Sequence, residues 1–179
     1  MTPFNNVYIG VDPGQRMAVV SLWKGAFWGW ATKMKNNRNS LPEIRGAINY
    51  MWNSIDSNKI VYWNILAPFV RFPKAALSLG KTHGLIESAC FEHSDKEEIR
   101  GKMLDTSARL KVFGKGNLKK EEAVTRFVKE FWPDCPEHRE TEANPTKWDS
   151  DIADAGVAAL AEAVEQGEDI EQWRITNGS

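Results

Sequence analysis

The apolar run at residues 7–11 (VYIGV) is the feature that most constrains how this chain folds. It ends at Asp12, which is followed by Pro13 and Gly14, a sequence that favours a sharp turn. A short strand without polar alternation is typical of a sheet that is covered on both faces. The pattern therefore predicts an α/β domain in which Asp12 lies at the end of a central strand.

Two further carboxylates lie near the other end of the chain. Asp151 and Asp154 are three residues apart, so on a helix they share one face. Acids near a helix start also complement the helix dipole, but Asp149 is the better candidate for that capping role. The alanines at 153, 155, 158 and 159 predict a helix that lies close against a sheet, where an unpaired acid would be costly.

The three acids together indicate a divalent-metal site for phosphoryl transfer. Asp12 alone is equally compatible with a turn-forming aspartate, so the conjunction with Asp151 and Asp154 carries the prediction. Magnesium prefers hard oxygen ligands, and two such ions about 4 Å apart can activate a water and stabilise a leaving oxygen.

The 179 residues suit one domain, placed at residues 1–179 with a core at about 5–165 and a frayed or loosely docked tail at 166–179. No apolar run approaches the ~20 residues of a membrane span, and no signal-peptide pattern opens the chain, so we expect a cytoplasmic protein without membrane contact. For a viral protein this would be the host-cell cytoplasm. Cys90 and Cys135 predict two free, buried thiols.

The charge distribution is segregated although the net charge is only −1. Between residues 109 and 120 five basic residues and no acid occur, and such a field can attract a polyanion. Lysines that merely solvate surface helices would give the same pattern. The five are Arg109, Lys111, Lys115, Lys119 and Lys120.

Hydrophobic periodicity and turn residues predict the remaining elements. We expect strands at 6–11, 17–23, 26–31 and 59–66, with a hairpin turn at 24–25 and an edge strand within 97–104. We expect helices at 41–54, 73–91, 107–113, 118–131 and 149–164. Trp28, Trp30 and Trp63, all on strands, are expected in the core.

Four segments resemble the RuvC-like Holliday junction resolvases of the RNase H-like superfamily. Residues 9–14 (IGVDPG) resemble the first family motif, and residues 76–84 (ALSLGKTHG) the long helix that builds the family's dimer interface. Residues 114–121 (GKGNLKKE) resemble the Gly-rich segment before the penultimate helix, and residues 151–155 (DIADA) the final acidic element. The resemblance runs from about residue 7 to 164, in the family's order.

This resemblance implies an RNase H-like mixed central sheet flanked by helices, and a crossover junction endodeoxyribonuclease acting in DNA recombination and repair. Asp12, Asp151 and Asp154 would hold Mg²⁺, with Mn²⁺ able to substitute. A homodimer formed through a helix at about 73–91 would resolve four-way junctions or other branched DNA by paired nicking, leaving 5′-phosphate and 3′-hydroxyl ends. The small size also fits a phage or mobile-element member.

The resemblance also suggests roles for basic and aromatic residues. Lys120 matches the catalytic helix lysine, and Arg109 or Lys111 an earlier lysine that contacts DNA phosphate; Lys115 and Lys119 extend this surface. Phe69 and Phe72 lie where relatives stack an aromatic ring on a junction base. Packing of either ring beneath its own loop is at least as compatible with the sequence.

The chain departs from the family at one position. Relatives place a glutamate at the end of the strand before the dimer helix, whereas this strand offers Asn64. An amide oxygen can ligate a metal but lacks the negative charge. The chain is then an inactivated variant, a degenerate relative, or an enzyme that draws a fourth acid from elsewhere, with Glu87 the nearest. We expect Asn64→Glu or Asn64→Asp to raise cleavage.

Three other functions remain compatible with the sequence. Asn64 favours a non-catalytic protein of the same fold that binds branched DNA without cutting it. A nuclease acting on RNA–DNA hybrids would have the same metal site. An actin-like sugar kinase or ATPase also opens with a Gly-x-Asp-x-Gly strand, but such proteins are about twice as long and carry a second phosphate loop that is missing here.

Overall fold

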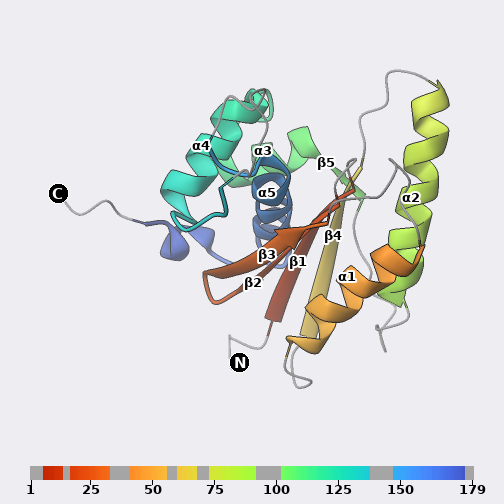
Figure 1. The fold of residues 1–179 in the computed structure, drawn as a ribbon. Helices are drawn as coiled ribbons and strands as arrows, with labels where there is room; N and C mark the ends of the chain where they lie inside the picture. The colour runs from red at the N-terminus through yellow and green to blue at the C-terminus, as the bar shows by residue number, and fades with distance from the viewer. Residues whose placement is uncertain are drawn as a thin grey trace.

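Five strands form one mixed sheet in the order β3-β2-β1-β4-β5, with β1 at its centre (Figure 1). β1 pairs antiparallel with β2 and parallel with β4; β2–β3 is antiparallel and β4–β5 parallel. This is the predicted mixed central sheet. The strands are β1 (Asn6–Asp12), β2 (Ala18–Trp23), β3 (Ala26–Ala31), β4 (Ile60–Ala67) and β5 (Lys102–Leu104).

The computed structural model describes residues 6–13, 17–32, 41–55, 60–67, 73–91, 102–137 and 147–175. Within these ranges no helix is long and apolar enough to cross a membrane. The helices are α1 (Leu41–Asn53), α2 (Pro73–Phe91), α3 (Asp105–Phe113), α4 (Lys120–Glu130), α5 (Ser150–Glu165) and the 3-10 helix η2 (Ile170–Trp173).

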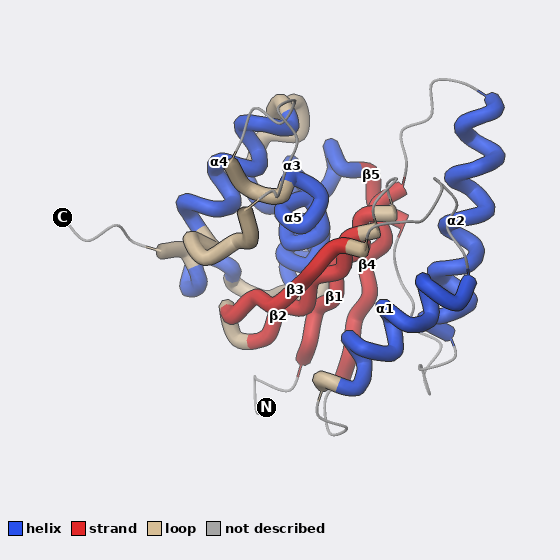
Figure 2. The backbone as a smooth tube through the Cα atoms, in the orientation of Figure 1, coloured by secondary structure: helices blue, strands red, loops and turns tan. Residues whose placement is uncertain are grey.

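Helices cover both faces of the sheet. Figure 2 shows α1 and α2 on one side, and α3, α4 and α5 on the other. Successive residues of β1 alternate between these layers: Ile9 and Val11 pack in the core beneath α1 and α2, while Tyr8 packs in the core with α5. The apolar run at 7–11 is continuous because both faces of β1 are buried, as the sequence predicted.

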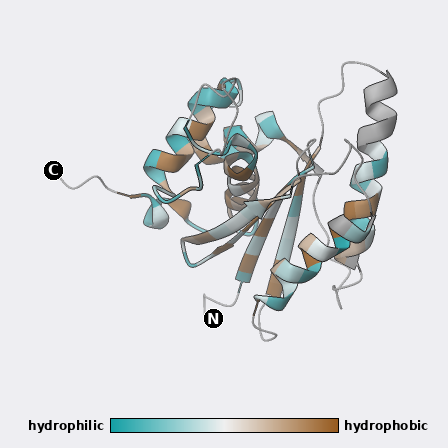
Figure 3. Ribbon diagram, in the orientation of Figure 1, coloured by the Kyte–Doolittle hydropathy of each residue, from teal (hydrophilic) through white to brown (hydrophobic). Residues whose placement is uncertain are grey.

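The covering helices differ in how much of their surface is buried. Figure 3 shows hydrophobic and hydrophilic residues alternating along α1 and α4, which have one solvent face. α4 buries Ala123, Val124, Phe127 and Val128, a spacing that places them on a single stripe. α5 is different, because residues 152–163 are all buried and half of them are alanine.

The β2–β3 hairpin forms where it was predicted. Its turn residues Lys24 and Gly25 both have positive φ, 52° and 78°, the backbone geometry that suits a two-residue hairpin turn. Cys90 and Cys135 are free and buried, also as predicted.

Two expectations about packing are wrong. Trp28 was expected in the core, yet it is 41% exposed and Trp30 is only half-buried, because β3 is an edge strand; Trp63, on β4, is buried. The segment after α5 was expected to be frayed or loosely docked. Up to residue 175, where the described residues end, η2 instead buries Ile170, and the Ile175 N–H donates to the Glu130 carbonyl over 2.7 Å.

Candidate active site

The carboxyl end of β1 carries Asp12 on the face that α5 covers. Gly10, two residues earlier on the same face, lies directly against α5: a Cβ built there would be 1.8 Å from the carbonyl oxygen of Ala155. The absence of a side chain at Gly10 therefore lets the helix approach the strand at backbone distance. This close approach brings the start of α5 near Asp12.

The first turns of α5 position the other two acids. Asp149 caps the helix, with its Oδ1 accepting from the N–H groups of Asp151 and Ile152 over 3.1 and 3.2 Å. The predicted capping role of Asp149 is thus confirmed, which leaves Asp151 and Asp154 free of it. Asp154 is 6% exposed, whereas Asp151 is half-buried.

The ammonium group of Lys120 joins the acids. Lys120 begins α4, and its Nζ lies 3.0 Å from Asp154 Oδ2 and 3.3 Å from Asp151 Oδ1. Burial alone would lower the pKa of Lys120, but the carboxylates of Asp154, Asp12 and Asp151 outweigh burial and raise it. Asp12 therefore lies within electrostatic reach of the same ammonium, which brings acids from both ends of the sequence near one cation.

Asp154 is held between two cations. Burial raises the pKa of the Asp154 carboxyl, and the positive charges of Lys120 and Arg109 oppose that rise. Arg109 Nη2 lies 3.5 Å from Asp154 Oδ1. Burial outweighs the two cations, so the pKa of the Asp154 carboxyl lies above its ordinary value. The two cations are the groups that favour its anionic form.

Asn64 lies on the same face of the sheet but deeper than Asp12. It is fully buried and in register with Gly10, and its Nδ2 donates to the Ala158 carbonyl of α5 over 3.1 Å. Asn64 Oδ1 has no hydrogen-bond partner within the described residues. A buried amide oxygen without a donor can accept one from a ligand or bind a cation.

The register of β1 and β4 identifies a second position of interest. The β1–β4 pairing ends with Val11 opposite Ile65, so the next residues, Asp12 and Leu66, are level with each other. Leu66 packs in the core on the α5 side. The β4 position level with Asp12 is thus apolar, and the sequence pattern missed it because Asn64 was the only polar residue in this part of the strand.

The remaining predicted site residues lie in different settings. Lys111 forms an ion pair with Glu165 of α5, while Lys115 and Lys119 are exposed in the loop between α3 and α4. Arg109 was predicted to contact DNA, but it is 6% exposed and its guanidinium bonds within the protein, so this arrangement does not support a phosphate contact. Phe69 and Phe72 lie outside the described residues.

The donor chemistry of this cluster fits a hard divalent cation. Asp12, Asp151 and Asp154 supply carboxylate oxygens, and Asn64 adds an unpartnered amide oxygen nearby. Among the described residues, however, no three His, Cys, Asp or Glu side chains have the arrangement of a formed metal site. Asp151 and Asp154 pair with the Lys120 ammonium instead, which neutralises them as a metal cation would, and Asp12 lies within electrostatic reach of the same group.

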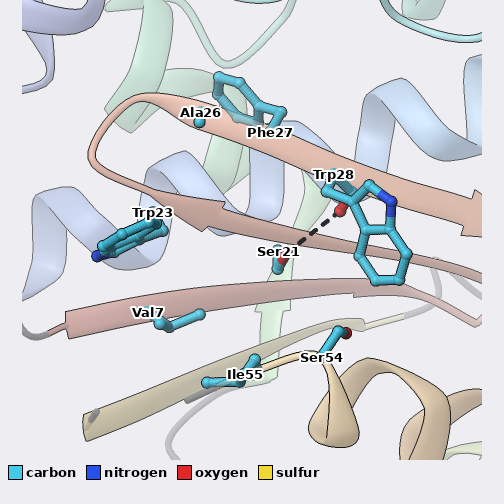
Figure 4. A pocket seen from close by; sticks show the side chains of 8 residues that line it. All are labelled: Val7, Ser21, Trp23, Ala26, Phe27, Trp28, Ser54 and Ile55. Carbon is cyan, nitrogen blue, oxygen red and sulfur yellow. Dashed lines mark hydrogen bonds between the residues drawn. The ribbon is translucent and has the colours of Figure 1, made fainter. Parts of the chain in front are cut away.

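A cavity of about 280 Å³ lies at the opposite end of β1 and has a different character (Figure 4). Its two hydroxyls are satisfied within the protein: Ser21 Oγ donates to the Trp28 carbonyl and Ser54 Oγ to that of Met51. Among the described residues that line it, none is ionisable, so they offer no chemistry comparable with the acid cluster. The lining residues are Val7, Ser21, Trp23, Ala26, Phe27, Trp28, Ser54 and Ile55.

Comparison with solved structures identifies the fold. The chain is similar to RuvC of Thermus thermophilus, with a TM-score of 0.60 and 16% sequence identity over 90% of this chain and 96% of that one. It is also similar to T. thermophilus RuvC in complex with a Holliday junction substrate, with a TM-score of 0.62, 15% identity and the same coverage of both chains. The RuvC-like fold predicted from the sequence is therefore confirmed.

Comparison of sequences alone finds no such likeness. No model of a known protein family matches this chain, and no curated protein sequence matches it.

Proposed function

We propose that this protein is a metal-dependent, structure-selective DNA endonuclease that nicks four-way junctions. One observation carries the proposal: Lys120 pairs with Asp151 and Asp154 within electrostatic reach of Asp12, at the end of the central strand. The cluster occurs in a fold shared with a RuvC whose structure is known in complex with a Holliday junction substrate. Among the described residues, this cluster of three acids and a lysine suits phosphodiester hydrolysis better than any other group of side chains.

Mg²⁺ is the proposed cofactor, and Mn²⁺ should substitute for it. Asp12, Asp151 and Asp154 would hold the metal, with the oxygen of Asn64 as a further neutral donor. When bound, the metal would supply an activated water and stabilise charge on the leaving oxygen, giving 5′-phosphate and 3′-hydroxyl ends.

Lys120 would act on the substrate itself. Its side chain is 46% exposed, so Nζ can turn from Asp151 and Asp154 toward a phosphate that approaches the cluster. There it would neutralise the phosphate and stabilise the charge that develops during cleavage. The exposed Lys115 and Lys119 precede it on the same loop and would hold the neighbouring backbone of the DNA.

We also propose that two copies associate through α2. Gly80 and Gly84 are exposed one turn apart, and a Cβ at either position would meet open space. Ile86, Ala89 and Cys90 of the same helix pack inward against the sheet. A second copy related by a two-fold axis would place two acid clusters in one assembly, as symmetric nicking of two strands requires. Branched DNA would be met in the cytoplasm of a cell or of a virus-infected host.

One observation favours a second candidate, a junction-binding protein that does not cut. β4 presents Asn64 and Leu66 on the α5 face, so neither position supplies a fourth carboxylate. Weakened metal binding would follow from the missing charge. Such a protein would still bind branched DNA through Lys115 and Lys119.

The test is nicking of a labelled four-way junction, a fork and a linear duplex in Mg²⁺ and in Mn²⁺. Paired nicks in the junction, absent from the duplex and lost in Asp12→Asn, are the expected result. Asn64→Glu should increase nicking if a missing acid limits activity. Tight junction binding without nicking by either protein would favour the non-catalytic candidate, and no preference for branched DNA would overturn both.

A further inference from the structure

Arg109 makes three contacts within the protein through one buried guanidinium. Its Nη1 donates to the carbonyl oxygen of Leu118 over 3.0 Å. Its Nη2 lies 3.3 Å from Asp105 Oδ2 on its own helix and 3.5 Å from Asp154 Oδ1 on α5. The side chain therefore ties α3, the loop before α4 and α5 together.

These contacts act on both halves of the acid cluster. Arg109 takes one oxygen of Asp154, and Lys120 takes the other over 3.0 Å, so the two cations fix the orientation of this carboxylate. Leu118 lies two residues before Lys120, so the bond to its carbonyl also fixes the backbone from which the Lys120 side chain extends. One side chain thus sets the position of a metal-ligand candidate and of the substrate lysine.

We propose that Arg109 is a positioning residue that orients Asp154 and the start of α4, and that it does not bind DNA. The inference rests on the proposed nuclease function. A guanidinium suits the task because Nη1 binds the Leu118 carbonyl while Nη2 faces the two carboxylates. A lysine would have to reach all three groups from one nitrogen atom. If Arg109 moved to a phosphate, Asp154 would stay buried with one partner fewer and Leu118 would lose its donor.

Lys115 provides the contrast that makes the proposal testable. It lies in the loop between Arg109 and Lys120, is exposed, and has no ion-pair partner within the described residues. A lysine in this setting can bind phosphate without breaking any contact inside the protein. Removal of Lys115 should change DNA binding, whereas removal of Arg109 should change what the site does after binding.

The experiment compares Arg109→Gln, Arg109→Lys and Lys115→Gln with the wild-type protein. Junction affinity is measured by fluorescence anisotropy in EDTA across a salt series, and cleavage by single-turnover kinetics in Mn²⁺. Arg126→Gln is the matched control, because Arg126 forms an ion pair with Glu130 away from the acid cluster and should leave both readouts unchanged.

For Arg109→Gln we expect junction affinity within about twofold of wild type and an unchanged salt dependence. The cleavage rate should fall by about 10- to 100-fold, as is typical when a partner of a metal ligand is removed. Arg109→Lys should recover only part of that loss. Lys115→Gln should weaken binding and reduce the slope of log affinity against log salt by about 0.9.

The proposal is overturned if Arg109→Gln reduces the salt slope as Lys115→Gln does, or if Arg109→Lys cleaves at the wild-type rate. Should Arg109→Gln fail to fold, the side-chain Nε–H signal of Arg109 in the wild-type NMR spectrum decides. No shift on addition of the junction supports positioning, and a shift as large as that of the Lys115 amide contradicts it.

Failure of the proposed function would look different. If the wild-type protein neither binds nor cuts a junction, the proposed nuclease function is ruled out. The positioning role of Arg109 can still be tested. Arg109→Lys should then speed amide hydrogen exchange at residues 118–120 and weaken Mn²⁺ binding measured by calorimetry. Unchanged exchange and unchanged Mn²⁺ binding would overturn the inference itself.

Discussion

The two faces of the sheet are built from the same strands but differ in the side chains that they present. On the face under α1 and α2, Ile9, Val11 and Ile65 form a closed apolar core. On the face under α5, β1 and β4 present Gly10, Asp12 and Asn64 to a helix that carries Asp151 and Asp154. The face under α1 and α2 buries apolar side chains, whereas the face under α5 has charged side chains at one end. The difference shows that the candidate site depends on one close helix–strand contact more than on the core as a whole.

The largest expected loss of stability comes from blocking the contact between Gly10 and α5. Gly10→Ala would place a Cβ 1.8 Å from the Ala155 carbonyl and 2.6 Å from the Ala159 nitrogen, so α5 would have to move. We expect a loss of more than about 3 kcal/mol in the free energy of unfolding, measured by urea denaturation.

The matched control lies on the other face. Gly46→Ala in α1 meets nothing within 4 Å and should stabilise the protein by up to about 1 kcal/mol. Equal destabilisation by the two substitutions would show that the contact with α5 is not the reason why Gly10→Ala destabilises the protein.

The next effect separates buried from exposed charge on the α5 face. Asp154→Ala removes a partner of both Arg109 and Lys120 and leaves the guanidinium buried. We expect it to cost about 3 kcal/mol of stability, whereas the half-buried Asp151 should cost less than about 1 kcal/mol when replaced by alanine. Cleavage should fall to background in both variants. Retained cleavage in either would remove that acid from the proposed site.

A smaller and purely functional effect is expected from adding charge to β4. Leu66→Glu would put a carboxylate level with Asp12, while Asn64→Glu would break the bond to the Ala158 carbonyl. Both should raise Mn²⁺-dependent cleavage, by about tenfold or more for the better-placed acid, compared at equal folded fractions. If neither does so, a missing acid on β4 is not what limits activity.

The smallest effect concerns the far end of the α5 face and depends on pH. Tyr8 donates to Glu168 over 2.7 Å, and burial, followed by this hydrogen bond, raises the pKa of the phenol. The unfolded chain ionises its tyrosines near pH 10, so the contribution of Tyr8 is present below that pH and is lost as the pH rises further. Tyr8→Phe should lose about 1 kcal/mol at pH 7 and show a shallower decline in alkali. An unchanged alkaline decline would contradict this assignment.

The sequence predicted much of the fold because apolar runs, turn residues and caps act locally. The strand predicted at 6–11, the hairpin at 24–25 and the cap at Asp149 all follow from a few neighbouring residues. The exposure of Trp28 did not follow, because strand order in the sheet is a long-range property. The docking of the segment after α5, through the burial of Ile170 and the bond from Ile175 to Glu130, was missed for the same reason.

The candidate site was predictable in its acids but less so in its surroundings. Asp12, Asp151 and Asp154 are recognisable by residue type and spacing. The burial of Arg109 against Asp154 joins residues 45 positions apart and leaves no periodic signal. The level position of Leu66 depends on the register between β1 and β4, which a strand pattern does not reveal.

The contact between Gly10 and α5 also limits how the chain can evolve. Any side chain at position 10 meets the main-chain carbonyl of residue 155, so no exchange of the Ala155 side chain removes the obstacle. A selection for second-site suppressors of Gly10→Ala should therefore return true revertants rather than changes in the facing helix. The backbone of α5 requires glycine at position 10. A substitution at position 155 therefore cannot compensate for one at position 10.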